Sequence, residues 1–187
     1  PRTTFGFFGN IAPHKGVLVA LAAARELVAE GVDFGLRIHG GMHFQPEAFR
    51  ADLASALEAA GPQVSWLGVY SRDELPGLMA AVDWVLVPST WWENAPLVIL
   101  EALQHRRPVL CPGIGGMAEL VRDGREGLHF RVGDARDLAR TMRRAMGTRG
   151  LWHQLVNALP SPQSLDQTVE RHLDLYRALL RTEEAVA

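Results

Sequence analysis

Residues 5–39 read FGFFGNIAPHKGVLVALAAARELVAEGVDFGLRIH, and this stretch decides the fold. Its first four residues, 5–8, are apolar and aromatic, which is typical of a short buried strand. Residues 15–30 then carry apolar side chains at helical spacing, and Gly31 ends that helix. A second strand pattern follows at 35–39. A strand, a helix and a strand in this order predict a βαβ unit, whose two strands run parallel.

The same alternation continues toward the C-terminus. Further strands are predicted at 64–67, 84–87, 108–111 and 127–130. Further helices are predicted at 46–60, 73–81, 96–104, 117–122, 134–146 and 164–181. The pattern therefore predicts an α/β, Rossmann-like fold, a doubly wound parallel β-sheet flanked by helices. In such sheets the carboxyl ends of the strands share one edge, and ligands bind there.

The composition is that of a folded globular domain. Hydrophobic residues make up 48% of the 187 residues and charged residues 21%. The formal net charge of −2 argues against broad nucleic-acid binding, and no apolar run approaches the length of a membrane span. Cys111 is the only cysteine, which excludes an intramolecular disulfide and a Cys-based zinc site and fits a reducing, cytoplasmic compartment. We expect one domain over residues 1–187, cut from a longer protein, since typical domains have roughly 150 residues.

The first junction between a strand and a helix runs from Gly9 to Gly16 and contains Lys15, the only lysine of the chain. Backbone N–H groups at such a turn, together with the helix dipole, favour an anion, and the Lys15 ammonium would reach the same anion. The junction matches neither the P-loop pattern nor G-x-G-x-x-G. The alternative is that Lys15 is a solvated residue of the first helical turn.

The strongest local signal is PSTWWENAPLVILEA, at 88–102. Pro96 suits the first position of a helix and Asn94 the cap before it, which would place Glu93 at the positive end of that helix. Glu101 lies in an apolar run, where a carboxylate is costly unless it is paired, and a sugar diol would offer it two donors. The alternatives are an exposed surface position for Glu101 and simple helix-end stabilisation for Glu93.

Two further features carry less information. The glycines between Gly113 and Gly116 would let the backbone approach an anion, although a mobile loop has the same composition. The arginine-rich stretch from Arg122 to Arg149 is expected to be a solvated face, with contact to acidic lipid as the alternative. The seven histidines show no metal-ligand spacing, so no metal site is expected.

Several motifs occur in a fixed order, each after a predicted strand. They are Gly9 with Lys15-Gly16, WLGVYS at 66–71, PS at 88–89 before Glu93-x7-Glu101-Ala102, PVL at 108–110 before GGxxE at 115–119, and VxDGxxG at 121–127. Together they resemble the C-terminal, donor-binding half of a retaining glycosyltransferase of family 4, with the GT-B fold. The resemblance spans roughly residues 5–147, and the motifs are specific jointly rather than singly.

The resemblance implies roles for the matching residues. Lys15 would bind the pyrophosphate of a nucleotide sugar, Glu101 the ribose hydroxyls and Glu93 the hydroxyls of the transferred sugar, which makes Lys15 and Glu93 the catalytic pair. No metal or other cofactor is implied. Asn10 stands where the family usually has an arginine that also binds the pyrophosphate. The implied donor-binding set is Gly9, Asn10, Lys15, Gly40, Val69 (through its backbone, toward the base), Glu93, Asn94, Ala95, Pro96, Leu97 and Glu101.

The implied activity is transfer of a sugar from a nucleoside diphosphate sugar to an acceptor hydroxyl, with retention of anomeric configuration. The implied partner is an N-terminal acceptor-binding domain of the parent chain, on which helix 164–181 would pack and without which the domain would be inactive. A peripheral membrane association of the parent is a further expectation. Two alternatives stay open: a non-catalytic nucleotide-binding or interaction module, and a nucleotide-sugar epimerase of the GT-B type. The base, the sugar and the acceptor are not specified by the sequence.

Overall fold

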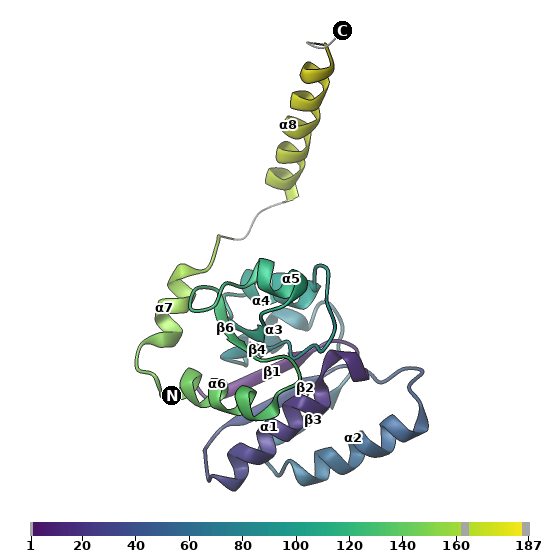
Figure 1. Ribbon diagram of the computed structural model, residues 1–187, viewed down its shortest axis with the longest axis vertical. Helices are drawn as coiled ribbons and strands as arrows, with labels where there is room; N and C mark the ends of the chain where they lie inside the picture. The colour runs from purple at the N-terminus through teal and green to yellow at the C-terminus, as the bar shows by residue number, and fades with distance from the viewer. Residues whose placement is uncertain (1, 162–164, 185–187) are drawn as a thin grey trace.

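The computed structural model describes residues 2–161 and 165–184, and these form an α/β fold around a six-stranded sheet in the order β3-β2-β1-β4-β5-β6 (Figure 1). Every strand pair is parallel, as predicted. Each predicted strand is present, with ends that shift by at most one residue. The strands are β1 (Thr4–Phe8), β2 (Gly35–His39), β3 (Val64–Gly68), β4 (Trp84–Leu86), β5 (Val109–Pro112) and β6 (Gly127–Phe130).

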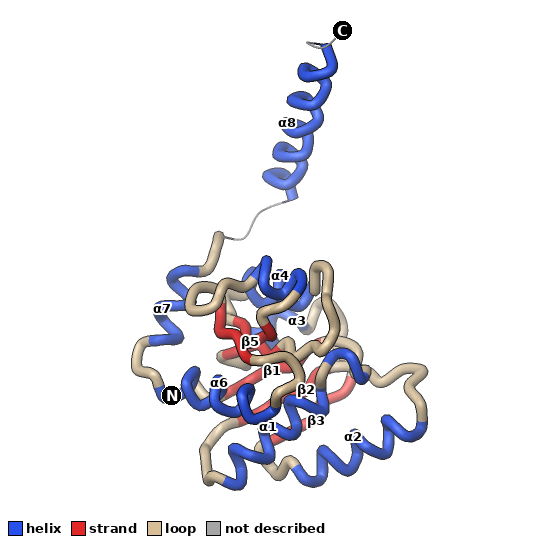
Figure 2. Tube along the Cα trace, in the orientation of Figure 1, coloured by secondary structure: helices blue, strands red, loops and turns tan. Residues whose placement is uncertain are grey.

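Helices cover both faces of the sheet (Figure 2). Alternate side chains of a strand point to opposite faces, so Phe5 and Phe7 pack into one buried cluster and Phe8 into the other. The first cluster lies under α1, α2, α6 and α7, and the second under α3, α4 and α5. The helices are α1 (Val17–Ala29), α2 (Glu47–Ala59), α3 (Leu75–Ala80), α4 (Leu97–Gln104), α5 (Gly115–Leu120), α6 (Ala135–Gly147), α7 (Leu151–Ala158) and α8 (Leu165–Glu184).

The strand order reverses between β1 and β4. The chain proceeds outward from β1 through β2 to β3, then returns to β4 on the other side of β1 and proceeds outward again. At such a switch point the crossover connections leave the two central strands in opposite directions, which opens a crevice at their carboxyl ends. The residues after β1 and β4 therefore occupy the position in which this kind of sheet binds ligands.

Apart from helix ends that shift by one or two residues, three helical features differ from the sequence-based predictions. Lys15 lies in a separate 3₁₀ turn, η1 (Pro13–Lys15), and α1 begins at Val17 because Gly16 between them is left-handed (φ 73°). Helix α7 was not predicted, because only Leu151 and Leu155 of its eight residues are buried and the apolar period is too short to recognise. Helix α8 lies apart from the sheet in Figure 1 and extends beyond the predicted 164–181; residue 164 is outside the described ranges.

No helix in the described ranges is both long and apolar enough to cross a membrane. That residues 1–187 act as a single domain stays a prediction.

Candidate functional site

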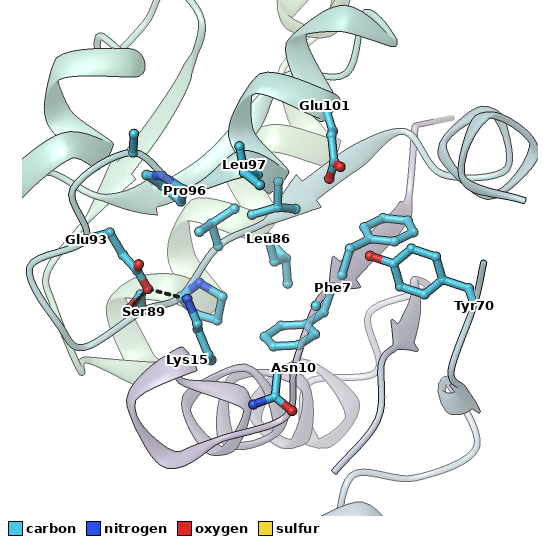
Figure 3. A pocket seen from close by; sticks show the side chains of 16 residues that line it. Phe7, Asn10, Lys15, Tyr70, Leu86, Ser89, Glu93, Pro96, Leu97 and Glu101 are labelled. Atoms are coloured by element: carbon cyan, nitrogen blue, oxygen red, sulfur yellow. Dashed lines mark hydrogen bonds and ion pairs between the residues drawn. The ribbon is translucent and has the colours of Figure 1, made fainter. Parts of the chain in front are cut away.

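A cleft of about 380 Å³ lies at the carboxyl ends of β1 and β4 (Figure 3). Its floor is made of Phe7 and Phe8 from β1 and of Leu86 and Val87 at the end of β4. The loops after these strands and the first turns of α4 form its walls. The remaining lining residues are Gly9, Asn10, Lys15, Tyr70, Pro88, Ser89, Glu93, Ala95, Pro96, Leu97, Val98 and Glu101.

One wall of the cleft holds an ion pair between Lys15 and Glu93. The Lys15 Nζ donates a hydrogen bond to the Glu93 Oε1 over 2.7 Å, although the two residues lie 78 positions apart. Gly16 makes this approach possible, because a Cβ there would lie 1.8 Å from the Pro88 carbonyl oxygen. The left-handed glycine thus lets the turn that carries Lys15 pack directly against the loop after β4.

The Glu93 carboxylate has a second donor in Ser89, whose hydroxyl lies 2.9 Å from the same Oε1. Burial raises the pKa of Glu93, but the hydrogen bonds from Lys15 and Ser89 and the positive charge of Lys15 outweigh it, so the net pKa is below its usual range. Glu93 is therefore a carboxylate at neutral pH, held by two donors on one oxygen.

The loop that carries Glu93 is anchored on the first turn of α5. The Gly116 N–H donates to the Glu93 carbonyl over 2.7 Å, and a Cβ at Gly116 would lie 1.5 Å from the Asn94 carbonyl oxygen. The prediction that Asn94 caps the next helix is wrong: the residue before α4 is Pro96, and no side chain caps that helix. The prediction that the glycines near Gly116 present N–H groups to an anion is also wrong for Gly116, because its N–H is used to hold the loop.

Glu101 projects from α4 into the opposite side of the cleft, near Tyr70 (Figure 3). It is half-buried, so the exposed surface position considered above does not apply. Among the described residues its carboxylate has no hydrogen bond or ion pair. Burial, and then the negative charge of Glu101, raise the pKa of Tyr70. Glu101 is thus a carboxylate whose hydrogen-bonding capacity is available to a ligand.

The cleft brings together most of the residues predicted for donor binding, but not all. Gly40, Val69 and Asn94 do not line it. Gly40 packs against the cleft residue Gly9, since a Cβ at Gly40 would lie 1.8 Å from the Gly9 carbonyl oxygen. Val69 lies in the loop after β3 and is 69% exposed. The predicted residues that line the cleft are Gly9, Asn10, Lys15, Glu93, Ala95, Pro96, Leu97 and Glu101.

The sequence reasoning assigned no role to Ser89 or Tyr70. Both belong to motifs that follow predicted strands, and their place after a strand is the signal that could have identified them as cleft residues. Within the lining described here Lys15 is the only cation, against the carboxylates of Glu93 and Glu101, and Asn10 adds no charge. The described residues contain no cluster of His, Cys, Asp and Glu that would hold a metal ion.

The fold of this chain is shared with solved structures of glycosyltransferases. A structure of HepE from Anabaena in complex with UDP superposes with a TM-score of 0.77 at 21% identity, covering 98% of this chain and 49% of that one. The C-terminal domain of LpcC, a group 1 family glycosyl transferase from Francisella tularensis, gives a TM-score of 0.74 at 21% identity, covering 83% and 81%.

Residues 2–148 match the family of glycosyl transferases group 1, and the chain belongs to this family. A D-inositol 3-phosphate glycosyltransferase from Nocardioides is 34% identical over 91% of this chain and 40% of its own length. A 2-deoxystreptamine glucosyltransferase from Streptomyces kanamyceticus is 34% identical over 75% of this chain and 35% of its own length. The chain thus spans less than half the length of these relatives.

Proposed function

We propose that this chain is the C-terminal, donor-binding half of a retaining glycosyltransferase of family 4. The parent would transfer a sugar from a nucleoside diphosphate sugar to an acceptor hydroxyl and retain the anomeric configuration. Family membership supports the reaction class, and the HepE structures with UDP and with UDP-glucose support the donor class. The observation that carries the proposal is the cleft at the switch point, with the Lys15–Glu93 pair on one wall. The other wall holds Glu101, whose carboxylate has no hydrogen-bond partner among the described residues.

Each wall then has a distinct chemical task. A bound diphosphate would take over the Lys15 ammonium, and with the N-terminus of α1 this cation would stabilise the charge that develops on the leaving phosphate. Glu93, released from Lys15, would accept hydrogen bonds from hydroxyls of the transferred sugar. Glu101 would accept from the two ribose hydroxyls. Backbone near Val69, and Gly40 and Asn94 with it, would complete the donor site.

The proposal includes independence from metal ions. Lys15 and the N–H groups at the start of α1 would stabilise the negative charge of the diphosphate, a task that a metal ion would otherwise perform. It also includes a cytoplasmic location and an N-terminal acceptor-binding domain in the parent, since much of the acceptor site would lie outside this chain. The isolated chain is then expected to bind donor without turning it over.

One observation favours a second candidate, a non-catalytic nucleotide-binding or interaction module on the same fold. Asn10 lines the cleft where the family usually has an arginine, and the remaining cation, Lys15, is already paired with a carboxylate. A pyrophosphate would therefore meet less positive charge than in a typical member. A parent chain that binds nucleotide but transfers no sugar would favour this candidate.

Calorimetric titration of the chain with UDP, GDP and ADP in the presence of EDTA tests the proposal. We expect one nucleotide to bind, and Lys15→Ala to weaken that binding at least tenfold, which is about 1.4 kcal/mol. Arg136→Ala is the matched control, because it removes an exposed cation away from the cleft and should leave the affinity unchanged. Equal affinity for the wild-type and Lys15→Ala chains would contradict the proposed donor site.

A further inference from the structure

Ser89 is a buried hydroxyl at the centre of the wall that carries Lys15 and Glu93. The residue is 1% exposed. The Oγ lies 2.9 Å from the Glu93 Oε1 and 2.9 Å from the His14 carbonyl oxygen, and the Trp91 N–H approaches it at 3.4 Å. Ser89 thus sits between the residue that precedes Lys15 and the carboxylate that Lys15 binds.

A serine hydroxyl has one proton, so it donates fully to only one of these two acceptors. Two observations favour Glu93 as the acceptor. A carboxylate is a stronger acceptor than a peptide carbonyl. In addition, the His14 carbonyl already accepts from the Thr90 N–H at 2.9 Å, so it does not need Ser89 to be satisfied.

Glu93 therefore has two side-chain donors of different kinds. A diphosphate would draw the Lys15 ammonium away from Glu93, because it carries more negative charge than one carboxylate. Ser89 is uncharged and buried, so a bound diphosphate would not draw its hydroxyl away from Glu93. We propose that Ser89 is a positioning residue: its hydroxyl keeps the Glu93 carboxylate in place in the cleft once Lys15 has been taken over by the diphosphate of the donor. The second half of this statement rests on the proposed function; the contact between Ser89 and Glu93 does not.

The direct test follows the Glu93 carboxyl by NMR in the 187-residue chain, without any ligand. We expect Ser89→Ala to raise the pKa of Glu93, because one donor to its charged form is lost. Thr90→Ala is the matched control: its hydroxyl lies 3.4 Å from the same His14 carbonyl oxygen but makes no hydrogen bond to Glu93, so the pKa of Glu93 should not move. The other titratable groups that act on Glu93, namely Lys15 and His14, stay in place in both variants.

The Lys15→Ala background imitates the loss of the ion pair on diphosphate binding. There Ser89 is the remaining side-chain donor, so Ser89→Ala should raise the pKa of Glu93 further than it does in the wild-type chain. Ser89→Cys, which keeps the size but is a weak donor, gives the same measurement should Ser89→Ala not fold. An unchanged Glu93 pKa in a folded Ser89 variant, in either background, would overturn the proposal.

Calorimetry with UDP and with UDP-glucose separates this role from the proposed function. Ser89→Ala should lower the affinity for UDP-glucose about tenfold more than the affinity for UDP, since only the sugar contacts Glu93. Equal losses for both ligands would overturn the positioning role and indicate a general defect of the cleft. Failure of the wild-type chain to bind either ligand would count against the proposed function, and the NMR cycle would still decide the role of Ser89.

Discussion

Glu101 carries a charge in the middle of a largely apolar helix, and in the described structure nothing donates to it. Such a group costs stability, and a helix of LVILEALQ would be more stable with alanine at this position. We therefore expect Glu101→Ala to raise the free energy of unfolding by roughly a few tenths of a kcal/mol in urea titrations. The same substitution should lower the affinity for UDP about tenfold, because the ribose hydroxyls lose their acceptor.

Inorganic pyrophosphate is the probe that makes this prediction specific. It has no ribose, so its affinity should be the same for the Glu101→Ala and wild-type chains. Glu58→Ala, on the exposed side of α2, serves as the control and should change neither affinity nor stability by more than about 0.5 kcal/mol. A loss of pyrophosphate binding in Glu101→Ala would contradict the assignment of Glu101 to the ribose and would indicate a general defect of the cleft.

At the scale of single residues, the sequence predicted the meeting of Lys15, Glu93 and Glu101 at one cleft. This was possible because all three follow strands of one parallel sheet, and the carboxyl ends of such strands share an edge. The role of Ser89 and the error at Asn94 have a common cause. Both depend on the path of the loop after β4, which is held by contacts with the turn that carries Lys15 and with Gly116 on α5, and no local pattern reports those contacts.

At the scale of elements, the loop of Glu93 and the first turn of α5 are joined through Gly116. A Cβ there would lie 1.5 Å from the Asn94 carbonyl oxygen, so one of the two backbones must move. We expect Gly116→Ala to lower the free energy of unfolding by about 3 kcal/mol and to weaken nucleotide binding, because the loop is displaced. Urea unfolding and calorimetry measure the two effects.

Gly77 provides the matched helical control. It lies in α3, with no atom within 4 Å of the position a Cβ would take. Gly77→Ala should therefore raise the free energy of unfolding by about 0.5–1 kcal/mol, as alanine does in a helix with free space. The same loss of stability in both variants would show that the contact with Asn94 is not the cause.

The strands were predictable because buried parallel strands are short apolar runs bounded by glycine and proline. The longer helices were predictable from their apolar period. Helix α7 was not, since a helix of eight residues with two buried leucines contains too little of that period. The 3₁₀ turn η1 was merged with α1 because the left-handed conformation of Gly16, which separates them, follows from packing against Pro88.

At the scale of the whole molecule, the sequence predicted a parallel sheet and its ligand-binding edge but not the strand order. The order depends on which way each crossover helix packs, and this is decided by contacts between elements far apart in the chain. The reversal between β1 and β4 is nevertheless what brings the Lys15 turn and the Glu93 loop together at one wall of the cleft.

Helix α8 presents an apolar stripe that the described part of this chain does not cover. Val169, Leu173, Tyr176 and Leu180 recur at helical spacing and are 48%, 44%, 55% and 62% exposed. An isolated helix of this length is only marginally stable in water, so its order in the parent would come from packing. Under the proposed function, the N-terminal domain of the parent supplies that packing.

We therefore expect the backbone amides of α8 to exchange with deuterium within seconds in the 187-residue chain and far more slowly in the parent. The amides of α1, which is buried against the sheet, should exchange slowly in both and serve as the control. The free energy of unfolding of a chain ending at Ser161 should differ by no more than about 0.5 kcal/mol from that of the 187-residue chain, because little of the α8 surface is buried in the 187-residue chain. Slow exchange of α8 in the 187-residue chain would contradict this, and would mean that the stripe is covered without any N-terminal domain.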